Sequence, residues 1–275
     1  MEIAAVLNVH DYPDVIRDTI ESISAYVTDK ILLIVDGASW PKLKNETFAA
    51  RKMEGFYHGA PRAPYRNVAL SLQTMIDEWP KADWYMYCEY DVLFGSSRIV
   101  KNLGMAADRG VWMLGSNGRI DDKAIPMVQS IVRENFQSVY YMLGACLFFH
   151  RYFFDRLKEI NFFERFLNMT SGFSDGYFPH YSGYDISEHM YPTLCRHLGG
   201  HVGVLSTYDE RGMWHGSFDR FPMRWKPELD PEKDDFPEAC IMHPLKAYDH
   251  PLRVKHREKR KLWISDLNNA EATAL

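Results

Sequence analysis

The sequence predicts an α/β protein with a mostly parallel central sheet flanked by helices. Three observations lead to this prediction. Through the first half of the chain, short uncharged runs alternate with segments of helical periodicity. The apolar runs are continuous rather than alternating, which is typical of strands buried on both faces. Hydrophobic residues make up 46% of the 275 residues, enough to fill a sizeable core.

The first half contains four predicted strands, three of which end in polar side chains. The helices between them carry apolar residues at helical spacing, so one stripe of each helix packs against the sheet. Because the ends of parallel strands meet at one edge, the polar side chains that follow the strands are expected to converge there. The predicted elements are strands at 3–7, 31–35, 56–57 and 84–88, and helices opening at Pro13 and near Ala69; the polar strand ends are Asn8, Asp36 and Glu89.

The second half is less regular, and its Gly144-Ala145-Cys146 segment lies inside a predicted strand. That glycine either allows a sugar to approach the backbone or marks a β-bulge. The predicted elements are strands at 111–114 and 140–149, one amphipathic helix over 151–167, an ordered loop at 170–184, a helix from Asp185 and an extended tail over 214–251.

Bulk properties exclude several classes of protein. A net charge of −5 argues against a nucleic-acid binder, which normally carries a basic surplus. The four cysteines (Cys88, Cys146, Cys195 and Cys240) are scattered and predict reduced thiols rather than disulfides or a zinc site. No signal peptide is visible, and no apolar run approaches the roughly 20 residues that span a bilayer. We therefore expect a soluble, cytoplasmic protein.

The triplet Glu89-Tyr90-Asp91 is the most informative motif, because it follows a buried strand directly. Charged groups are costly to bury unless they are paired or bound to a cation. Two carboxylates at a strand end suit Mn²⁺ or Mg²⁺ carrying a phosphate. The alternative is a pair of surface carboxylates at a turn.

With these residues in view, the sequence resembles the GT-A family of nucleotide-sugar-dependent glycosyltransferases over about residues 1–115. The triplet departs from the family's usual Asp-x-Asp by beginning with Glu. The matching segments are the first strand with its polar loop, Asp36-Gly37-Ala38-Ser39, Arg66-Asn67-x-Ala69, the triplet and a late His243-Pro244.

The resemblance implies one GT-A-type, Rossmann-like domain over residues 1–275 with a C-terminal extended or helical elaboration. Residues 1–115 would form the nucleotide-sugar-binding half and residues 116–250 the acceptor-binding half. Residues 251–275 would form a basic tail. No linker or internal repeat divides the chain.

The resemblance also implies nucleotide contacts. Asn8, His10 and their loop would meet the nucleobase and ribose, Asp36 would accept hydrogen bonds from the base or ribose, and Arg66 would approach the diphosphate. The alternatives are a turn at Asn8 and His10, a strand-exit turn at Asp36, and a surface ion pair at Arg66. For Asn67, an N-cap is preferred to a ligand role.

For the metal, the resemblance implies that Asp91 binds Mn²⁺ or Mg²⁺, with Glu89 on the metal or the ribose. His243 is the candidate third ligand, since a late histidine completes metal coordination in several GT-A families. Its rivals are His215 and His250, and a core or surface histidine is the alternative. Lys246 is placed to neutralise the departing diphosphate.

Inverting transfer to a hydroxyl needs a general base. Asp185 and Glu188 resemble the acidic pair at the start of a helix in inverting GT-A enzymes, with Asp185 preferred. The alternative is that they are helix N-terminal acids favoured by the macrodipole; a retaining mechanism would then need no such base.

These assignments together predict a metal-dependent glycosyltransferase of the hexosyltransferase type. It would use a nucleoside-diphosphate-sugar donor and a carbohydrate or other hydroxyl acceptor, and inversion with a carboxylate base is preferred. A non-catalytic nucleotide-sugar-binding protein is the alternative. A sugar nucleotidyltransferase is disfavoured, because the loop 8–11 lacks the glycine of a phosphate-binding loop. Aromatic residues at 177, 181, 184 and 214 are candidates for stacking on sugar rings.

The basic run 255–261 and the apolar residues after it allow at most peripheral contact with anionic lipid. A solvated terminal helix is the preferred interpretation of this run.

Overall fold

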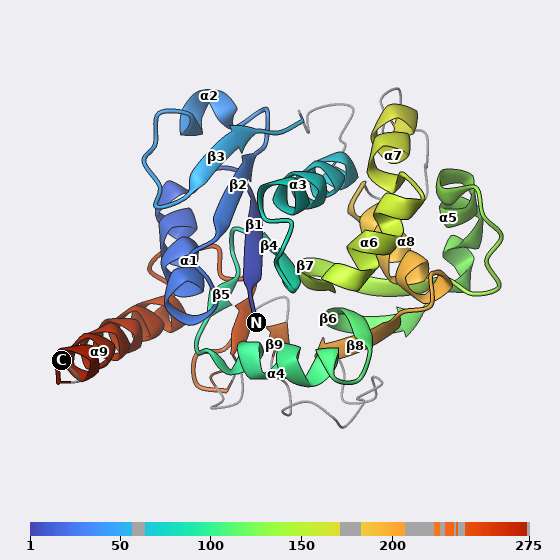
Figure 1. The fold of residues 1–275 in the computed structure, drawn as a ribbon. Coiled ribbons are helices and arrows are strands. Elements are labelled where there is room, and N and C mark those ends of the chain that lie inside the picture. Colours follow the sequence, from blue (N-terminus) through green and yellow to red (C-terminus); the bar gives the residue numbers. More distant parts are fainter. Residues whose placement is uncertain are drawn as a thin grey trace.

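A seven-stranded sheet runs through the centre of the structure, a computed structural model (Figure 1). The structure describes residues 1–56, 64–170, 183–206, 223–225, 229–233, 235 and 240–273. The strand order is β3-β2-β1-β4-β7-β6-β8. The strands are β1 (Ile3–Val9), β2 (Ile31–Val35), β3 (Arg51–Glu54), β4 (Trp84–Glu89), β6 (Val111–Ile120), β7 (Tyr140–His150) and β8 (His201–Ser206).

The sheet is mostly parallel, as the sequence predicts. Strands β3, β2, β1 and β4 pair in parallel, and so do β6 and β8. Strand β7 is the exception, because it runs antiparallel to both of its neighbours, β4 and β6. The amino-terminal half of β7 therefore extends past the carboxyl end of β4.

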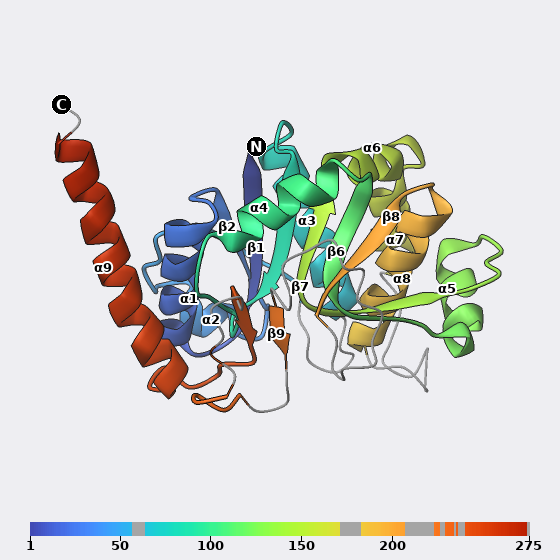
Figure 2. The same ribbon diagram turned by 90° about the horizontal axis from the view of Figure 1, so that it is seen from below.

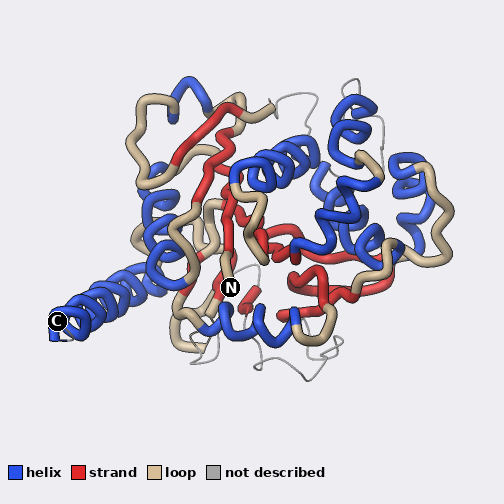
Figure 3. Tube along the Cα trace, viewed as in Figure 1, coloured by secondary structure: helices blue, strands red, loops and turns tan. Residues whose placement is uncertain are grey.

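Helices cover both faces of the sheet, and Figure 3 shows the strands enclosed between them. Alternation along β1 divides the core: Ala4 and Val6 pack toward α3, whereas Ile3, Ala5 and Leu7 pack toward α1. One face is covered by α1 (Pro13–Tyr26) and α4 (Arg98–Ala107), and the other by α3 (Pro64–Glu78), α5 (Ile125–Val132), α6 (Arg151–Glu159), α7 (Phe162–Thr170) and α8 (Gly183–His197).

A second, three-stranded sheet brings the late part of the chain to the end of β4. Its central strand is β10 (Ile241–His243), which pairs antiparallel with β5 (Leu93–Phe94) and parallel with β9 (Met223–Trp225). Cys240, Ile241 and Met242 are fully buried, so this short apolar run is anchored against the core. The pairing fixes residues near 243 beside residues near 91.

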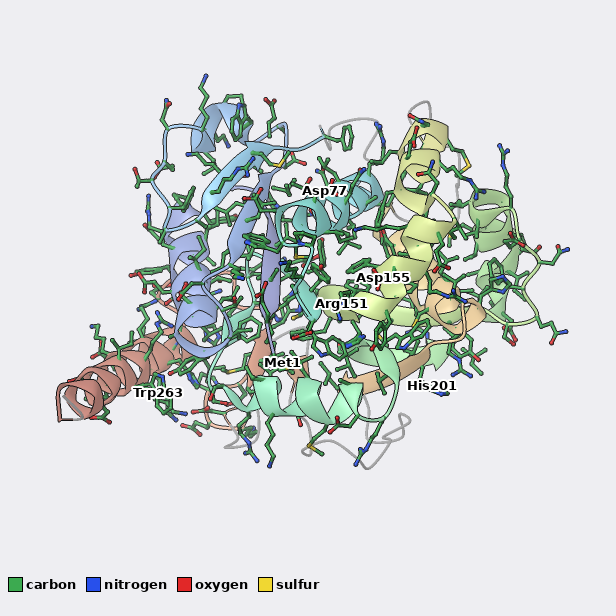
Figure 4. The ribbon with its side chains drawn as sticks, viewed as in Figure 1. Met1, Asp77, Arg151, Asp155, His201 and Trp263 are labelled. Carbon is green, nitrogen blue, oxygen red and sulfur yellow. The ribbon has the colours of Figure 1, made fainter. Side chains whose placement is uncertain are left out.

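The last helix, α9 (Pro251–Thr273), lies beside α1 and then continues past the body of the molecule (Figures 1 and 2). Trp263 sits on this helix and packs against the end of α1, with 6.1 Å between its ring centroid and that of Tyr26 (Figure 4). The preferred interpretation of a solvated helix is wrong for its first half. Arg253, His256 and Arg260 are at most 3% exposed there.

Two further predictions are corrected. The third strand is β3 at 51–54 rather than 56–57, and Phe56 lies in the segment that follows it. The single helix predicted over 151–167 is two helices, α6 and α7, because Asn161 between them adopts a positive φ of 49°. The short α2 (Trp40–Leu43) and a 3₁₀ turn (Asp122–Ala124) complete the helices of the described residues.

Other predictions have mixed outcomes. All four cysteines are free and buried, as expected for reduced thiols. Within the part of the chain that the structure describes, no helix is both long enough and apolar enough to cross a bilayer. The predicted loop at 170–184 and most of the predicted tail over 214–251 lie outside the described residues. The division of the chain at 115 and 250 stays a prediction.

Candidate metal and nucleotide site

Three side chains from two distant parts of the sequence meet at the carboxyl end of β4. Glu89 is the last residue of β4, Asp91 follows two residues later, and His243 is the last residue of β10. His243 Nε2 lies 3.2 Å from Asp91 Oδ1 and 3.5 Å from Glu89 Oε2. One ligand atom from each residue lies within 4.8 Å of the other two. Two carboxylate oxygens are ligands that suit Mn²⁺ or Mg²⁺, and an imidazole nitrogen is a ligand typical of transition-metal ions.

The electrostatics of this triad fit a cation site. The side chains of Asp91 and His243 are only 2% and 10% exposed, and that of Glu89 is 27% exposed, so one buried and one half-buried carboxylate share the site with a buried imidazole. Burial alone lowers the pKa of His243, but hydrogen bonds and charges from Asp91 and Glu89 outweigh it and raise that pKa to about 9. Burial alone raises the pKa of Asp91, yet His243 and Lys246 bring it below its usual value. A proton on His243 thus provides the positive charge that a bound cation would otherwise supply.

Backbone contacts fix the two ligand-bearing segments against each other. The pairing of β10 with β5 sets Met242 opposite Leu93. Beyond it, the backbone N–H of Leu245 donates to the carbonyl of Asp91 at 2.9 Å. The peptide bond between His243 and Pro244 is cis. These contacts hold His243 at the position of the third ligand, as the sequence predicts, and the role of metal ligand stays a prediction.

A small pocket next to the triad contains most of the predicted nucleotide-binding residues. Asn8 pairs in register with Glu89 across β1 and β4, and the backbone N–H of Asp36 donates to Val9 at 2.9 Å. The convergence of strand ends predicted from the sequence is therefore present. The pocket is lined by Asn8, Val9, His10, Ile34, Asp36, Asn67, Tyr87 and Glu89.

Local contacts show what each pocket residue already does within the fold. Asn8 Nδ2 donates to the Tyr87 hydroxyl at 3.1 Å, and the Ser71 hydroxyl donates to Asn8 Oδ1 at 2.6 Å. Asp36 Oδ1 accepts the backbone N–H of Ala38 at 2.7 Å, as expected for the strand-exit turn. The buried carboxylate of Asp36 is thus held at the pocket wall.

Aromatic side chains surround the middle residue of the acidic triplet. The ring of His10 packs edge-on against Tyr90, with 4.5 Å between centroids, and Tyr12 stacks on Tyr90 at 6.0 Å. Asp11 and Tyr12 both have positive φ angles, of 45° and 57°. Consecutive positive φ values are unusual for non-glycine residues, and such strain tends to accumulate at functional loops.

Arg66 packs on Phe56, and its predicted approach to the diphosphate stays a prediction, whereas the predicted N-cap at Asn67 is wrong. The Arg66 guanidinium lies 3.9 Å from the Phe56 ring centroid, and its Nη2 donates to the carbonyl of Leu167 at 3.5 Å. Burial lowers the pKa of Arg66. Arg66 is not among the described residues that line the small pocket. Asn67 is not an N-cap: helix α3 begins at Pro64, and the Asn67 amide bonds the backbone N–H and carbonyl of Phe56 at 2.6 and 3.0 Å.

Glu188 lies at the same edge of the sheet as the triad. Its Oε1 accepts the backbone N–H of Gly144 at 2.7 Å. Cys146 is the last β7 residue paired with β4, opposite Cys88, so Gly144 passes just beyond the end of β4. Asp185 lies about one turn earlier in α8, and its side chain is outside the described residues.

The remaining candidates divide into three groups. Lys246 is exposed and lowers the pKa of Asp91, so it lies near the triad, and its predicted role at the diphosphate stays a prediction. His250 Nδ1 accepts the backbone N–H of Leu252 at 3.2 Å, where α9 begins, and is not in the triad. His215, Trp214, Tyr177, Tyr181 and the side chain of Tyr184 lie outside the described residues.

Sequence reasoning missed the buried charges behind the site. Asp18 of α1 is 2% exposed and accepts hydrogen bonds from Arg253 Nη1 and Arg260 Nη2, each at 2.6 Å. Arg253, Arg257 and Arg260 recur at helical spacing and so share one face of α9, but this spacing does not identify the partner of that face.

Comparisons with known proteins find structural likeness without sequence likeness. No family model and no curated protein matches the sequence. Among solved structures, the glycosyltransferase GlyE of Streptococcus pneumoniae is 12% identical with a TM-score of 0.47, over 100% of this chain and 64% of its own. An active-site mutant of LgtC is 14% identical with a TM-score of 0.43, over 93% and 95% of the two chains.

A third solved structure, a mannose-1-phosphate geranyltransferase from Thermus thermophilus, is 11% identical with a TM-score of 0.42, over 74% and 73% of the two chains. Two of these three proteins are glycosyltransferases, LgtC being a galactosyltransferase. With identities this low, none of the three assigns an activity to this chain.

Proposed function

We propose that this chain is a metal-dependent glycosyltransferase that moves a sugar from a nucleoside-diphosphate-sugar to a hydroxyl acceptor. The observation that carries the proposal is the meeting of Glu89, Asp91 and His243 beside the pocket that contains Asp36. A cation site next to a pocket at the carboxyl edge of a mostly parallel sheet is the arrangement needed to hold a nucleotide through its phosphates.

In this proposal Glu89, Asp91 and His243 hold Mn²⁺ or Mg²⁺. When bound, such an ion stabilises the negative charge of a departing diphosphate without any proton transfer. Lys246 is exposed beside Asp91 and adds positive charge in the same place. Asp36 and the pocket around Asn8 and His10 would orient the nucleoside.

The acceptor side of the proposal depends on α8. In an inverting transfer, the acceptor oxygen bonds to the anomeric carbon as the bond to the diphosphate breaks, and the hydroxyl proton passes to a carboxylate. Asp185 and Glu188 are the candidates for that base. The hydrogen bond from Gly144 stabilises the ionised form of Glu188, which is the form that accepts a proton.

The variants Asp185→Asn and Glu188→Gln distinguish an enzyme from a non-catalytic nucleotide-sugar-binding protein by their effect on turnover. In an enzyme, the variant that lacks the base loses turnover but still binds donor, because α8 does not contribute to the triad. In a binding protein the wild type has no transfer activity, and neither substitution changes a measured rate.

The first experiment is a thermal-shift screen of UDP-, GDP-, CMP- and dTDP-sugars with and without Mn²⁺. A bound ligand raises the free energy of unfolding by RT ln(1 + [L]/Kd), and the unfolding temperature rises with it. A donor that stabilises only with Mn²⁺ therefore identifies the nucleotide and the metal requirement together. If no donor stabilises the protein under either condition, the proposal is wrong.

A matched pair of variants tests whether the triad is responsible. Asp91→Asn removes a charge from the triad, and Asp83→Asn removes one just before the amino end of the same strand, at the opposite edge of the sheet. We expect Asp91→Asn to abolish the Mn²⁺-dependent shift and Asp83→Asn to keep it. Equal loss in both variants would indicate general destabilisation instead of a metal site.

A further inference from the structure

We propose that Arg253 of α9 is a positioning residue that holds the ligand-bearing segments of Asp91 and His243 in register with each other. This inference rests on the proposed metal site and adds a residue to it. Arg253 is fully buried, although it belongs to the basic end of the chain. It makes no hydrogen bond to a ligand side chain in the described residues, so its positioning effect would pass through the backbone. Its charge also attracts Asp91, and losing that charge would favour cation binding rather than weaken it.

The guanidinium group of Arg253 donates in three directions. Its Nη1 donates to Asp18 Oδ2 at 2.6 Å, its Nε to the carbonyl of Leu245 at 2.8 Å, and its Nη2 to Thr19 Oγ1 at 3.2 Å. The charge is balanced by Asp18, which is itself buried. A rigid planar fork can make these contacts together, whereas a lysine ammonium on a flexible stem cannot reproduce their directions.

The hydrogen bond from Arg253 Nε connects the guanidinium group to both ligand-bearing segments, because its acceptor is Leu245. This residue lies two positions after His243, and its backbone N–H donates to the Asp91 carbonyl at 2.9 Å. Its own carbonyl accepts from Arg253. The peptide groups of Leu245 are thus held between Arg253 on one side and Asp91 on the other.

The hydrogen bond from Arg253 Nη2 to Thr19 connects the guanidinium group to the acidic triplet. The Thr19 hydroxyl oxygen lies 2.6 Å from the Tyr90 carbonyl and 2.8 Å from the Val92 carbonyl, so its single proton bonds a carbonyl of one of the two residues that flank Asp91. Arg253 donates to the same oxygen and leaves that proton free for the carbonyls. Both backbone segments therefore connect to one buried side chain.

Such an arrangement matters because metal ligands must be held within narrow limits. Groups behind the ligands fix their orientation, and their loss typically costs about 10- to 100-fold in metal affinity. The sequence around Arg253 does not predict this role, because the role depends on tertiary contacts: α9 packs against α1, and α1 packs against β5, which pairs with β10.

Arg260 provides a matched control within the same helix. It donates to Asp18 Oδ1 at 2.6 Å and to Glu21 at 3.0 Å, and no contact with either ligand segment is found in the described part of the chain. Replacing Arg260 should therefore weaken the packing of α9 about as much as replacing Arg253, without releasing Leu245 or Thr19.

The experiment measures Mn²⁺ affinity in the full chain from the electron paramagnetic resonance signal of free Mn²⁺, at a temperature where every variant is folded. We expect Arg253→Met to raise the Kd for Mn²⁺ by about 10-fold or more and Arg260→Met to change it by less than about twofold. Arg253→Lys, which keeps the charge beside Asp18, should also raise the Kd. Equal increases in the two Met variants, or an unchanged Kd in Arg253→Met, would overturn the inference.

Thr19→Val supplies the test if Arg253→Met does not fold. It removes the hydroxyl that joins Arg253 to the triplet and keeps the shape and the Asp18 ion pair. A raised Kd supports the inference, and an unchanged Kd contradicts it. If the wild type binds no Mn²⁺, the proposed function fails along with it, whereas normal wild-type binding with an unaffected Arg253→Met variant overturns this inference alone.

Discussion

At the scale of single residues, His243 connects the protonation of the site to its ability to bind a cation. Its imidazole nitrogen lies between two carboxylates, which raise its pKa to about 9. A metal ligand must be the neutral imidazole, so a cation and a proton compete for the same nitrogen. The two carboxylates that suit a divalent ion therefore also stabilise the protonated imidazole of His243 when no metal is bound.

The first prediction is that Mn²⁺ binding tightens as pH rises from 6.5 to 9. Below the raised pKa, the imidazole is protonated without metal, and each ion bound releases about one proton. Isothermal titration in two buffers of different ionisation enthalpy at pH 7 measures this release. His243→Gln should bind Mn²⁺ more weakly and release no proton. A pH-independent wild-type Kd would exclude His243 as a ligand.

The second prediction concerns Gly144. A Cβ there would lie 3.2 Å from Glu188 Oε1 and 3.3 Å from Glu188 Cγ, so Gly144→Ala must displace the carboxylate by a few tenths of an ångström. If Glu188 is the base, the turnover number should fall about tenfold while the Kd for Mn²⁺ is unchanged, as expected for a misplaced group. Gly104→Ala is the control, because a Cβ there meets nothing within 4 Å. Unaltered turnover in Gly144→Ala would argue against Glu188.

At the scale of elements, the boundary between α6 and α7 depends on one backbone angle. Asn161 has a φ of 49°, a value that asparagine tolerates better than most residues. The turn lets the phenylalanines of α7 pack against α3 and α8, whereas one straight helix would carry them away from that core.

The third prediction follows from this turn. Asn161→Val should lower the free energy of unfolding by about 1–2 kcal/mol, because a β-branched side chain is strained at positive φ. Asn161→Gly should be nearly neutral, since glycine adopts this φ without a steric cost. Urea denaturation of both variants separates strain from the lost Asn161–Glu164 hydrogen bond, which both substitutions remove. Equal destabilisation would assign the effect to that bond.

At the scale of the whole molecule, a buried cluster of charges fastens the last helix to the first. Asp18 accepts from Arg253 and Arg260, and Arg257 lies 3.7 Å from it. Breaking a buried ion pair by removing one partner is costly, because it leaves the other charge uncompensated. These contacts join residues more than 230 positions apart in sequence.

The fourth prediction is that Asp18→Asn lowers the free energy of unfolding by about 3–5 kcal/mol, since two buried arginines lose their counter-charge. Asp14→Asn on the same helix removes the exposed ion pair with Arg17 and should cost less than about 1 kcal/mol. Chemical denaturation compares the two variants. A similar small loss in both would mean that α9 is not held by this cluster.

Features set by neighbouring residues could be predicted from the sequence, whereas features set by contacts between distant parts of the chain could not. The strands that end at Asn8, Asp36 and Glu89 could be predicted because a buried parallel strand is a continuous apolar run, and their convergence follows from strand direction alone. The Asp18 cluster could not be predicted with such rules, because its charges come from opposite ends of the chain. The partner of a charged helix face is set by packing, and local periodicity does not contain it.

The antiparallel direction of β7 could not be predicted from the sequence either, and this direction determines which residues lie near Glu89. As an antiparallel neighbour, β7 carries Gly144, and with it Glu188, to the place where β4 delivers Glu89. An insertion or deletion of one residue in either strand would turn every side chain beyond it to the opposite face of the sheet. The spacing between the two halves of the proposed chemistry thus depends on the lengths of β4 and β7. Apart from Glu89 and Gly144, which take part in that chemistry, substitutions in these strands leave the spacing unchanged, whereas a change of length in one strand alone does not.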